Sequence, residues 1–557
     1  MYTEKPTMTI HRKRFEIWTI ISVGLFFVFL IFFIYPIGML LRQAFTTPQK
    51  LYTFDNFIKF FSKPFYYNTI LNSFKVSVAA AFVSLVVGIV FAYFYSFYRL
   101  KGARFLAVAS VLCCMSAPFI GAYAWILLMG RSGAITLLLK NIGINTGTIY
   151  GFSGILLVQA TKLYPLVFIY MNGMFGSIDN SLMEASSNLG CTGVKRFFLI
   201  VLSLSMPTIL AAALLVFMRA FADFGTPLLI GEGYRTFTVE IYKQFLSETG
   251  ADYGFASAIS VIAIVLTAVI FWLQKYAAKK FSFTMNALHP VEKKSVHGVR
   301  GIFMHIYCYG VVAISLLPQL YIIYISFRKT KLGVFQNGYS LESYRLAISR
   351  LLFRAIKNTT LVGLIALAVI ILFAVLISYL VVRRPNPFNH LIDTVSMLPY
   401  IMPGSVIAIA LVIGFGHKPI VLTGTLTIMI IAVIIRRLPY TTRSATATLM
   451  QISMSIEEAA LSLGSSKINT FFKITVPMMS SGIVSGAILS WVSIVTEVSS
   501  AAILYNNRSI TLTVGTYAAV SRGNVGEGAA FAAVTTVLTA LSLLVYIKIN
   551  RNENFDI

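Results

Sequence analysis

The chain is poor in charged residues, and most of the charge it has is positive. Only 11% of its 557 residues are Asp, Glu, Lys or Arg, whereas an ordinary soluble protein has about 25%. Hydrophobic residues make up 57%. A soluble fold of this size could not cover its surface with so few charges. The composition therefore predicts a protein that lies in the lipid bilayer.

Carboxylates are especially scarce. Nineteen Asp and Glu stand against 45 Lys and Arg, which gives a formal net charge of +26. Binding to nucleic acid would require a soluble basic face with aromatic platforms, which this composition argues against. Basic residues at the cytoplasmic ends of membrane spans explain the excess instead. We therefore expect the lipid bilayer, and no nucleic acid, among the partners.

Residues that commonly catalyse reactions or hold metals are also few. The four cysteines and six histidines are scattered without the spacing of metal ligands. No Ser/His/Asp arrangement and no paired carboxylates appear. The chain has no Gly-Lys dipeptide, and hence no P-loop to bind nucleotide phosphates. We expect no catalytic residue, no metal site and no cofactor in this chain, which argues against an enzyme.

The chain does contain apolar runs long enough to cross a membrane, for which about 20 residues are needed. An even number of spans places both termini on one side, and the distribution of Lys and Arg favours the cytoplasm. We therefore predict an all-α, multi-pass protein of the cell membrane with about 12 transmembrane helices. The predicted spans are 17–41, 68–98, 105–129, 150–172, 197–222, 254–274, 302–326, 356–382, 391–414, 420–438, 478–504 and 528–547.

A basic, turn-rich stretch separates the spans into two sets of six. The stretch contains Lys279, Lys280, Lys293, Lys294 and Pro290 and shows no periodicity. The expected organisation is a cytoplasmic segment at 1–16, a first half at 17–274, a basic cytoplasmic linker at 275–301, a second half at 302–548 and a cytoplasmic tail at 549–557.

The two halves repeat each other. Adding 274 to a position carries Pro165 to Pro439, and the same offset carries Phe197-Phe198 to Phe471-Phe472. Upstream, Asn72 corresponds to Asn358 at an offset of 286, so we expect a longer connection in the first half near 130–150. Six spans in each half make this a parallel repeat of six-helix units, with a pathway expected between them.

Two short segments, 181–190 and 455–464, follow the fourth and tenth spans. Each begins with Ser-x-x-Glu, in which Ser181 or Ser455 would cap a helix and the glutamate would reach back to the cap. Each ends at a glycine, Gly190 or Gly464, which can take the left-handed conformation that ends a helix. We predict a pair of stiff, self-capped helices on the cytoplasmic side.

The second segment resembles the E-A-A-x(3)-G-x(9)-I-x-[LV]-P signature of ABC importer permeases. The first segment departs from the signature at Ser186 and Ser203. The chain as a whole resembles a fused, two-half type I ABC importer permease, and it is most similar to the ferric-iron type. The second segment matches at Glu458, Ala459, Ala460, Gly464, Ile474, Val476 and Pro477, and the first matches at Glu184, Ala185, Gly190, Ile200 and Leu202.

This resemblance implies partners and a cargo. Two copies of a separate ABC ATPase subunit, which bind ATP and Mg, would dock on the short helices, and an extracytoplasmic substrate-binding protein would deliver the cargo. Ferric iron is the expected cargo, and phosphonates, sugar phosphates, thiamine and polyamines remain alternatives. The resemblance assigns ATPase coupling to Glu184, Ala185, Gly190, Glu458, Ala459, Ala460 and Gly464. Because the second copy is more complete, we expect Gly464→Val to be more harmful than Gly190→Val.

Ionisable residues inside spans are costly and usually functional. Asp223 and Glu497 occupy equivalent positions, and Arg219 lies one turn before Asp223. These three are our candidates for a pathway or gate, because two carboxylates near a central axis would suit a hard cation such as Fe³⁺. Alternatively, Arg219 and Asp223 only neutralise each other as an i,i+4 ion pair. We interpret Lys162 and Arg436-Arg437 as anchors at the ends of spans.

A secondary transporter of the major-facilitator type is the main alternative, since it shares parallel six-span halves. That class has an Asp-Arg pair in the loop between its second and third spans. The corresponding loop here, 98–104, contains no aspartate. The alternative also gives no reason for two capped helices in matching places.

Overall fold

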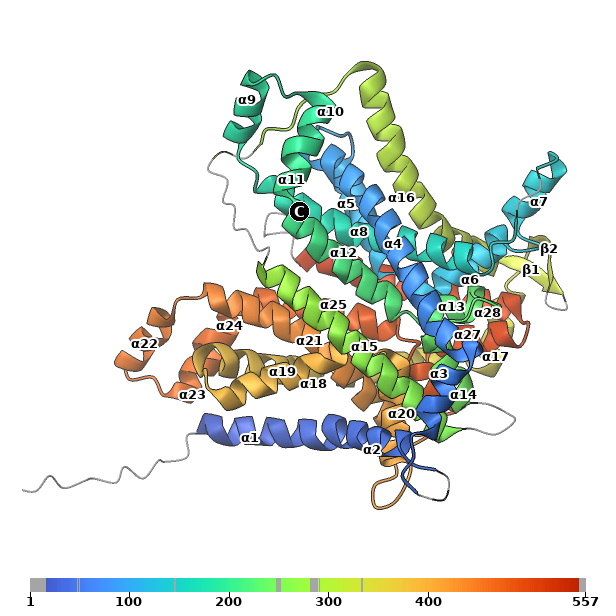
Figure 1. Ribbon diagram of the computed structural model, residues 1–557, viewed down its shortest axis with the longest axis vertical. Coiled ribbons are helices and arrows are strands. Elements are labelled where there is room, and N and C mark those ends of the chain that lie inside the picture. Colours follow the sequence, from blue (N-terminus) through green and yellow to red (C-terminus); the bar gives the residue numbers. More distant parts are fainter. Residues whose placement is uncertain are drawn as a thin grey trace, which may run out of the picture.

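The computed structural model describes residues 17–549, except 48, 50, 145–146, 247–251, 281–288, 290 and 332–333. The expected terminal segments, 1–16 and most of 549–557, lie outside the described residues. Helices form most of the described part (Figure 1). The first half contains α1 Ile17–Phe29, the π-helical turn η1 Leu30–Ile34, α2 Tyr35–Ala44, α3 Asp55–Ser62, α4 Pro64–Phe97, α5 Ala103–Met115, α6 Pro118–Met129, α7 Ala134–Asn141, α8 Phe152–Gly176, α9 Asn180–Asn188, α10 Gly193–Arg196, η2 Phe197–Val201, α11 Leu202–Leu204, α12 Met206–Phe221, α13 Gly225–Ile230, α14 Phe237–Phe245 and α15 Tyr253–Lys280.

The second half repeats this order without a counterpart of α7, and it adds one small hairpin. Strands β1, Arg328–Lys331, and β2, Val334–Tyr339, pair antiparallel, with Arg328 opposite Tyr339. The all-α prediction missed this hairpin. The helices are α16 Gly298–Ser326, α17 Glu342–Arg350, α18 Leu352–Arg383, α19 Pro387–Ile401, α20 Gly404–Phe415, α21 Leu426–Gln451, α22 Met454–Ser462, α23 Lys467–Thr470, the π-helical turn η3 Phe471–Thr475, α24 Val476–Met478, α25 Ser480–Val495, α26 Ala501–Leu504, α27 Leu512–Ser521 and α28 Val525–Ile549.

The number of membrane spans depends on how bent helices are counted. Among the described residues, eight helices are long and apolar enough to cross a membrane, or up to eleven if each bent pair is one span. Helix α21 is not among these, because Arg436 and Arg437 interrupt its apolar run. Its counterpart in the first half, α8, is long and apolar enough to cross a membrane. Counting α21 with its counterpart gives the twelve spans that the sequence predicts.

Several predicted spans are broken rather than continuous, as two examples show. The span expected at 391–414 consists of α19 and α20, which meet at an angle of 112°. The span expected at 105–129 consists of α5 and α6. Pro403 and Pro118 lie at these breaks, where a proline cannot continue the helical hydrogen bonds. Helices α5, α19 and α20 have 12 to 15 residues, or about 18–22 Å, which is shorter than the hydrocarbon core of about 30 Å. Helix α6 continues into α7 as an apolar stretch of 24 residues, Pro118–Asn141.

The structure confirms the internal repeat element by element. The elements from α10 to α12 recur from α23 to α25, with every boundary displaced by 274 residues. Helix α6 recurs as α20 at the offset of 286. The extra twelve residues lie in the longer connection between α6 and α8, which contains α7. This is the place where the sequence predicted them.

Equivalent polar contacts also recur in the two halves. The Ser73 hydroxyl accepts from the Phe237 backbone N–H at 3.0 Å, and the Thr359 hydroxyl accepts from Leu512 at 2.9 Å. Next to these residues, the Asn72 side chain donates to the Arg235 carbonyl and the Asn358 side chain to the Ile510 carbonyl. Both contacts fix the chain after the fifth span to the second span of the same half.

The first helix of each half packs against the other half. Trp18 of α1 contacts the rings of Tyr379 and Phe471, and Ser22 donates to Asn389 at 2.8 Å. In the reverse direction, Tyr307 of α16 donates to the Val87 carbonyl. The halves therefore exchange their first helices, and neither half buries its surface alone.

The two ends of the molecule carry different elements. Helices α9 and α22 lie on the left of Figure 1, and α7 and the β1–β2 hairpin lie on the right. Helix α8 has 25 residues, so it separates the α6–α8 connection from α9 by about 37 Å. The short helices therefore lie at one end of the spans, and the hairpin lies at the opposite end.

Candidate functional site

The two short helices are capped, but not by the predicted serines. The cap of α9 is Asp179, whose side chain accepts from the backbone N–H of Ser181 at 2.9 Å. The cap of α22 is Ser453, which accepts from the backbone N–H of Ser455 at 3.3 Å. Each helix thus begins two residues earlier than expected. The predicted capping box is wrong, because Glu184 and Glu458 fall too far along the helix to reach the cap.

The ends of both helices match the prediction. Gly190 has φ +73° and Gly464 has φ +86°, both in the left-handed region. The Gly190 N–H donates to the Ser187 carbonyl, and the next N–H, that of Cys191, donates to the Ser186 carbonyl. This pair of bonds is the Schellman arrangement, and the second copy repeats it. A Cβ atom at either glycine would meet nothing within 4 Å, so the backbone angle alone requires glycine.

Each short helix presents an exposed outer face. Glu184 and Ala185 are exposed on α9, as are Glu458 and Ala459 on α22, whereas Ala460 faces inward. Apolar side chains continue these faces at the helix ends, where Leu189 is 86% exposed and Leu463 is 89% exposed. Such paired apolar surfaces at one end of a membrane protein are typical of docking sites.

The inner face of α22 is held by a buried ion pair that the sequence analysis missed. Arg383, at the end of α18, bonds Glu457 at 2.8 Å and also donates to the Ile452 carbonyl. Tyr379 donates to the same carboxylate at 3.4 Å. The neighbouring Glu458, which carries the sequence signature, points outward. Motif matching alone could not tell these two glutamates apart.

The inner face of α9 is held differently. The positions equivalent to Arg383 and Glu457 are Phe97 and Met183, both buried apolar side chains. The chain between the halves provides the polar contacts instead. The backbone N–H of Asn180 donates to the His289 carbonyl, and the His289 N–H donates to the Asp179 carboxylate. Part of the expected linker therefore packs directly against the first short helix.

A sharp bend connects each short helix to the next span. The two segments bend by 72° at Ser205 and by 67° at Met479, each just after a π-helical turn. An aromatic pair fixes each turn, with ring centroids 4.6 Å apart for Tyr93–Phe197 and 4.8 Å apart for Tyr379–Phe471. These contacts hold each π-helical turn against the second span of its half, since Tyr93 lies on α4 and Tyr379 lies on α18.

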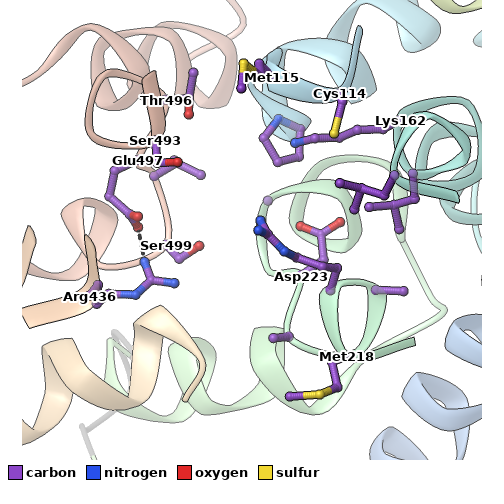
Figure 2. A pocket seen from close by; sticks show the side chains of 18 of the residues that line it. Cys114, Met115, Lys162, Met218, Asp223, Arg436, Ser493, Thr496, Glu497 and Ser499 are labelled. Atoms are coloured by element: carbon purple, nitrogen blue, oxygen red, sulfur yellow. Dashed lines mark hydrogen bonds and ion pairs between the residues drawn. The ribbon is translucent and has the colours of Figure 1, made fainter. Parts of the chain in front are cut away.

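A cavity of about 270 Å³ lies between the halves and brings all three predicted pathway residues together. Figure 2 shows Glu497 and Arg436 on one side of it, and Asp223 and Lys162 on the other. Arg219, Arg437 and Tyr440 complete the polar wall. Lys162, Arg436 and Arg437 are therefore not anchors at span ends. They lie inside α8 and α21, which continue past Pro165 and Pro439.

Glu497 is buried and held on both carboxylate oxygens. Oε1 accepts from Arg436, and Oε2 accepts from Arg437. The Ser500 backbone N–H and hydroxyl also donate to Oε1, at 3.0 and 3.1 Å. A carboxylate with this many donors is a fixed part of the wall.

Arg219 and Asp223 do not form the predicted ion pair. Helix α12 ends at Phe221, so Asp223 no longer follows the helical spacing that would bring it to Arg219. The Asp223 carboxylate accepts from Gln159 at 3.3 Å and from the Thr226 N–H at 3.4 Å. The Arg219 guanidinium instead lies 5.9 Å from the ring centroid of Tyr400 and 5.6 Å from that of Tyr440, both in the second half. It therefore links the halves across the cavity.

The carboxylates around the cavity do not assemble into a metal cage. Across the described ranges of the chain, no group of three or more His, Cys, Asp or Glu side chains is placed to hold a metal ion. The cavity is thus lined by charged side chains from both halves.

Comparisons with known proteins agree with this architecture. The family model described as "Binding-protein-dependent transport system inner membrane component" matches residues 84–283 and 370–552. One match falls in each half, and together they cover more than half of the chain. This result decides against the major-facilitator alternative.

Individual relatives show the same organisation. The chain is 27% identical over 502 residues to the putative ferric transport system permease protein FbpB 1 of Haemophilus influenzae, covering 86% of this chain and 77% of that protein. It is 27% identical over 549 residues to the ferric transport system permease protein FbpB of Actinobacillus pleuropneumoniae, covering 96% and 78%. The spermidine/putrescine transport system permease protein PotB of Haemophilus influenzae is 28% identical over 271 residues, covering 47% of this chain and 93% of PotB.

The half-length relative aligns with about half of this chain, as expected for a fusion of two such units. The repeat, the paired short helices and the matched family domains all describe one architecture. The chain therefore belongs to the family of inner membrane components of binding-protein-dependent transport systems, as a multi-pass, two-half permease of the type I ABC importer class.

Proposed function

We propose that this chain forms the translocation pathway of an importer for ferric iron, driven by two copies of a separate ABC ATPase subunit. The ATPase binds ATP and Mg, and an extracytoplasmic binding protein delivers the cargo at the end that carries the β1–β2 hairpin. Both chain termini and the short helices α9 and α22 lie on the cytoplasmic side. The permease itself hydrolyses nothing.

One observation carries the coupling role. Helices α9 and α22 are equivalent by the repeat and end in the same left-handed glycine, and they expose matching faces at one end of the molecule. A sharp bend connects each to a span that borders the cavity. A motor that moves the two helices relative to each other would therefore move the two walls of the cavity.

Site-specific cross-linking tests this coupling role. Cysteines at the exposed positions Ala185 and Ala459 should cross-link to the co-purified ATPase subunit, each to a different copy. A cysteine at Lys140, on α7 at the opposite end, is the matched control and should give no ATPase adduct. Failure of both Ala185 and Ala459 to cross-link, with a normal yield of complex, would remove the coupling role.

The cargo proposal is supported by the two ferric permeases that align with most of the chain. The test is uptake of ⁵⁵Fe³⁺ by cells with and without this chain. Glu458→Arg should abolish chain-dependent uptake, because it reverses charge on the exposed face of α22, while the permease still inserts. Unchanged iron uptake in cells without the chain would reject ferric iron as the cargo.

A phosphonate importer is the second candidate. Its support is the alignment with the putative 2-aminoethylphosphonate transport system permease protein PhnU of Salmonella paratyphi A, at 24% identity over 286 residues, together with the basic side chains around the cavity. Uptake of labelled 2-aminoethylphosphonate in the same pair of strains separates the two cargoes.

A further inference from the structure

The cavity between the halves carries more positive than negative charge. Its lining includes two carboxylates, Asp223 and Glu497. Four basic side chains line the same space, which leaves an excess of two positive charges. The basic side chains are Lys162, Arg219, Arg436 and Arg437.

The repeat shows where this excess is located. Lys162 corresponds to Arg436 and Asp223 corresponds to Glu497, each at the offset of 274. In the second half, Arg436 and Arg437 close on Glu497. In the first half, Lys162 and Asp223 are not within ion-pair distance of each other. Over the part of the chain that the structure describes, neither Lys162 nor Arg219 has a carboxylate partner.

Polar donors in the same wall also lack partners. The Thr226 hydroxyl and the Nε of Arg437 are buried and make no hydrogen bond with any described residue, and the same holds for one acceptor, the Oε1 of Gln159. All three residues line the cavity. Figure 2 shows the Lys162 side chain extending from the first half toward the space that it shares with Arg436 and Glu497. A ligand in this space would meet the N–H donors of the basic side chains that line it.

We infer that this cavity takes its cargo as an oxyanion, which Lys162 and Arg219 bind through phosphate, phosphonate or carboxylate oxygens. Arginine and lysine recognise such oxygens by charge-assisted hydrogen bonds. A bare Fe³⁺ ion would meet the excess positive charge and find Glu497 already held by two arginines. An oxyanion coordinated to Fe³⁺ satisfies both needs, because its oxygens bind the hard metal on one side and the basic side chains on the other.

The oxyanion has two possible sources. It is either an anion that travels with Fe³⁺ as a complex or a free phosphonate-type cargo. The first source rests on the proposed ferric function, whereas the second does not. The charge of the cavity is common to both, so binding and source require separate experiments.

The binding experiment is calorimetric titration of the purified full chain in lipid nanodiscs with inorganic phosphate and with citrate. We expect saturable binding of at least one anion, weakened at least tenfold by Lys162→Met and by Arg219→Met. Lys162→Arg should retain binding, because it keeps the positive charge at this position. Lys140→Met, a basic residue of α7 outside the cavity, should bind like the unaltered chain. Absence of saturable binding, or equal binding by all variants, would overturn the inference.

The source experiment follows uptake of ⁵⁵Fe³⁺ together with ³³P-phosphate, and separately of labelled 2-aminoethylphosphonate. If Lys162→Met lowers the ⁵⁵Fe and ³³P signals together, iron travels with its anion. If only phosphonate uptake depends on the chain, the anion cavity stands and the ferric function falls. If ⁵⁵Fe uptake depends on the chain but is unchanged by Lys162→Met and Arg219→Met, the anion inference is overturned and the ferric function stands.

Discussion

At the residue scale, the same task is done by different chemistry in the two halves. The ion pair of Arg383 with Glu457 holds α22, and both side chains are less than 10% exposed. The equivalent Phe97 and Met183 are apolar and buried under α9. Removing one partner of a buried ion pair strongly destabilises the folded protein. Replacing both partners with apolar side chains often changes its stability little. The first half has such an apolar pair in place of the ion pair.

We therefore predict a non-additive result for this pair. Arg383→Phe alone or Glu457→Met alone should lower the free energy of unfolding by about 3–5 kcal/mol, because each leaves a buried charge without its counter-ion. The double variant, which copies the first half, should lose much less than the sum. Thermal unfolding of the four purified chains in detergent measures the cycle. A double variant that loses the full sum would show that the pair has no coupling energy.

The two helix-ending glycines give a second prediction. Gly190→Ala and Gly464→Ala should each destabilise the chain by about 1–2 kcal/mol, because an L-residue is strained at positive φ. We expect equal losses, since both sites have the same angle range and open space around the Cβ. The expectation that Gly464→Val is more harmful than Gly190→Val concerns function and stays a separate prediction.

The control for these glycines is Gly173→Ala. Gly173 lies within α8, where a Cβ would also meet nothing within 4 Å but φ is not positive. This change should be neutral or slightly stabilising, because alanine favours a helix. The unfolding temperatures of the three variants test this explanation. A decrease for Gly173→Ala as large as that for Gly190→Ala would contradict the argument from the backbone angle.

At the element scale, the sequence predicted well those features that one residue type dictates. The ends of α9 and α22 were predicted because glycine alone tolerates the left-handed conformation easily. The starts were misplaced by two residues, since Asp179 and Ser453 are as good N-caps as Ser181 and Ser455. Hydropathy identified the apolar run across Pro403 but not its 112° bend. Backbone direction depends on packing, which an apolar run does not encode.

The cavity was only partly predictable, for a related reason. Asp223 and Glu497 stood out as carboxylates within apolar runs at equivalent positions. Lys162 and Arg436 were assigned to span ends, because a charge beside an apolar run resembles a boundary with water. Only the continuation of α8 and α21 past their prolines places these side chains inside the molecule.

The caps of the short helices provide a prediction at this scale. Asp179→Ala and Ser453→Ala should each cost about 1 kcal/mol of local helix stability. Asp179 also accepts from the His289 N–H at 3.1 Å, whereas Ser453 has no contact with the linker among the described residues. Hydrogen exchange should therefore accelerate in both α9 and the His289 segment for Asp179→Ala, but only in α22 for Ser453→Ala. Unchanged exchange around His289 would show that Asp179 does not hold the linker.

At the scale of the whole molecule, the halves are related by a parallel repeat and joined by exchange of their first helices. Trp18 packs within the second half, and Tyr307 contacts the first. Arg219 adds a contact from the first half to Tyr400 and Tyr440 of the second. Motion of one short helix is therefore communicated to both sides of the cavity through contacts that cross between the halves.

A parallel repeat requires both short helices to face the same compartment, which predicts the outcome of cysteine labelling. Leu189→Cys and Leu463→Cys replace the two most exposed leucines of these helices, and Ile144→Cys replaces a 51% exposed residue just after α7. The native Cys113, Cys114, Cys191 and Cys308 must first be replaced. The chain without its native cysteines must still support transport.

An impermeant maleimide should label positions 189 and 463 in inside-out vesicles and not in intact spheroplasts. Position 144 should show the reverse, because α8 carries the chain about 37 Å from the α7 side to α9. Labelling of 189 and 463 from opposite sides would mean that the repeat is inverted. A single motor acting at one membrane face could then not reach both helices, and the coupling mechanism would be rejected.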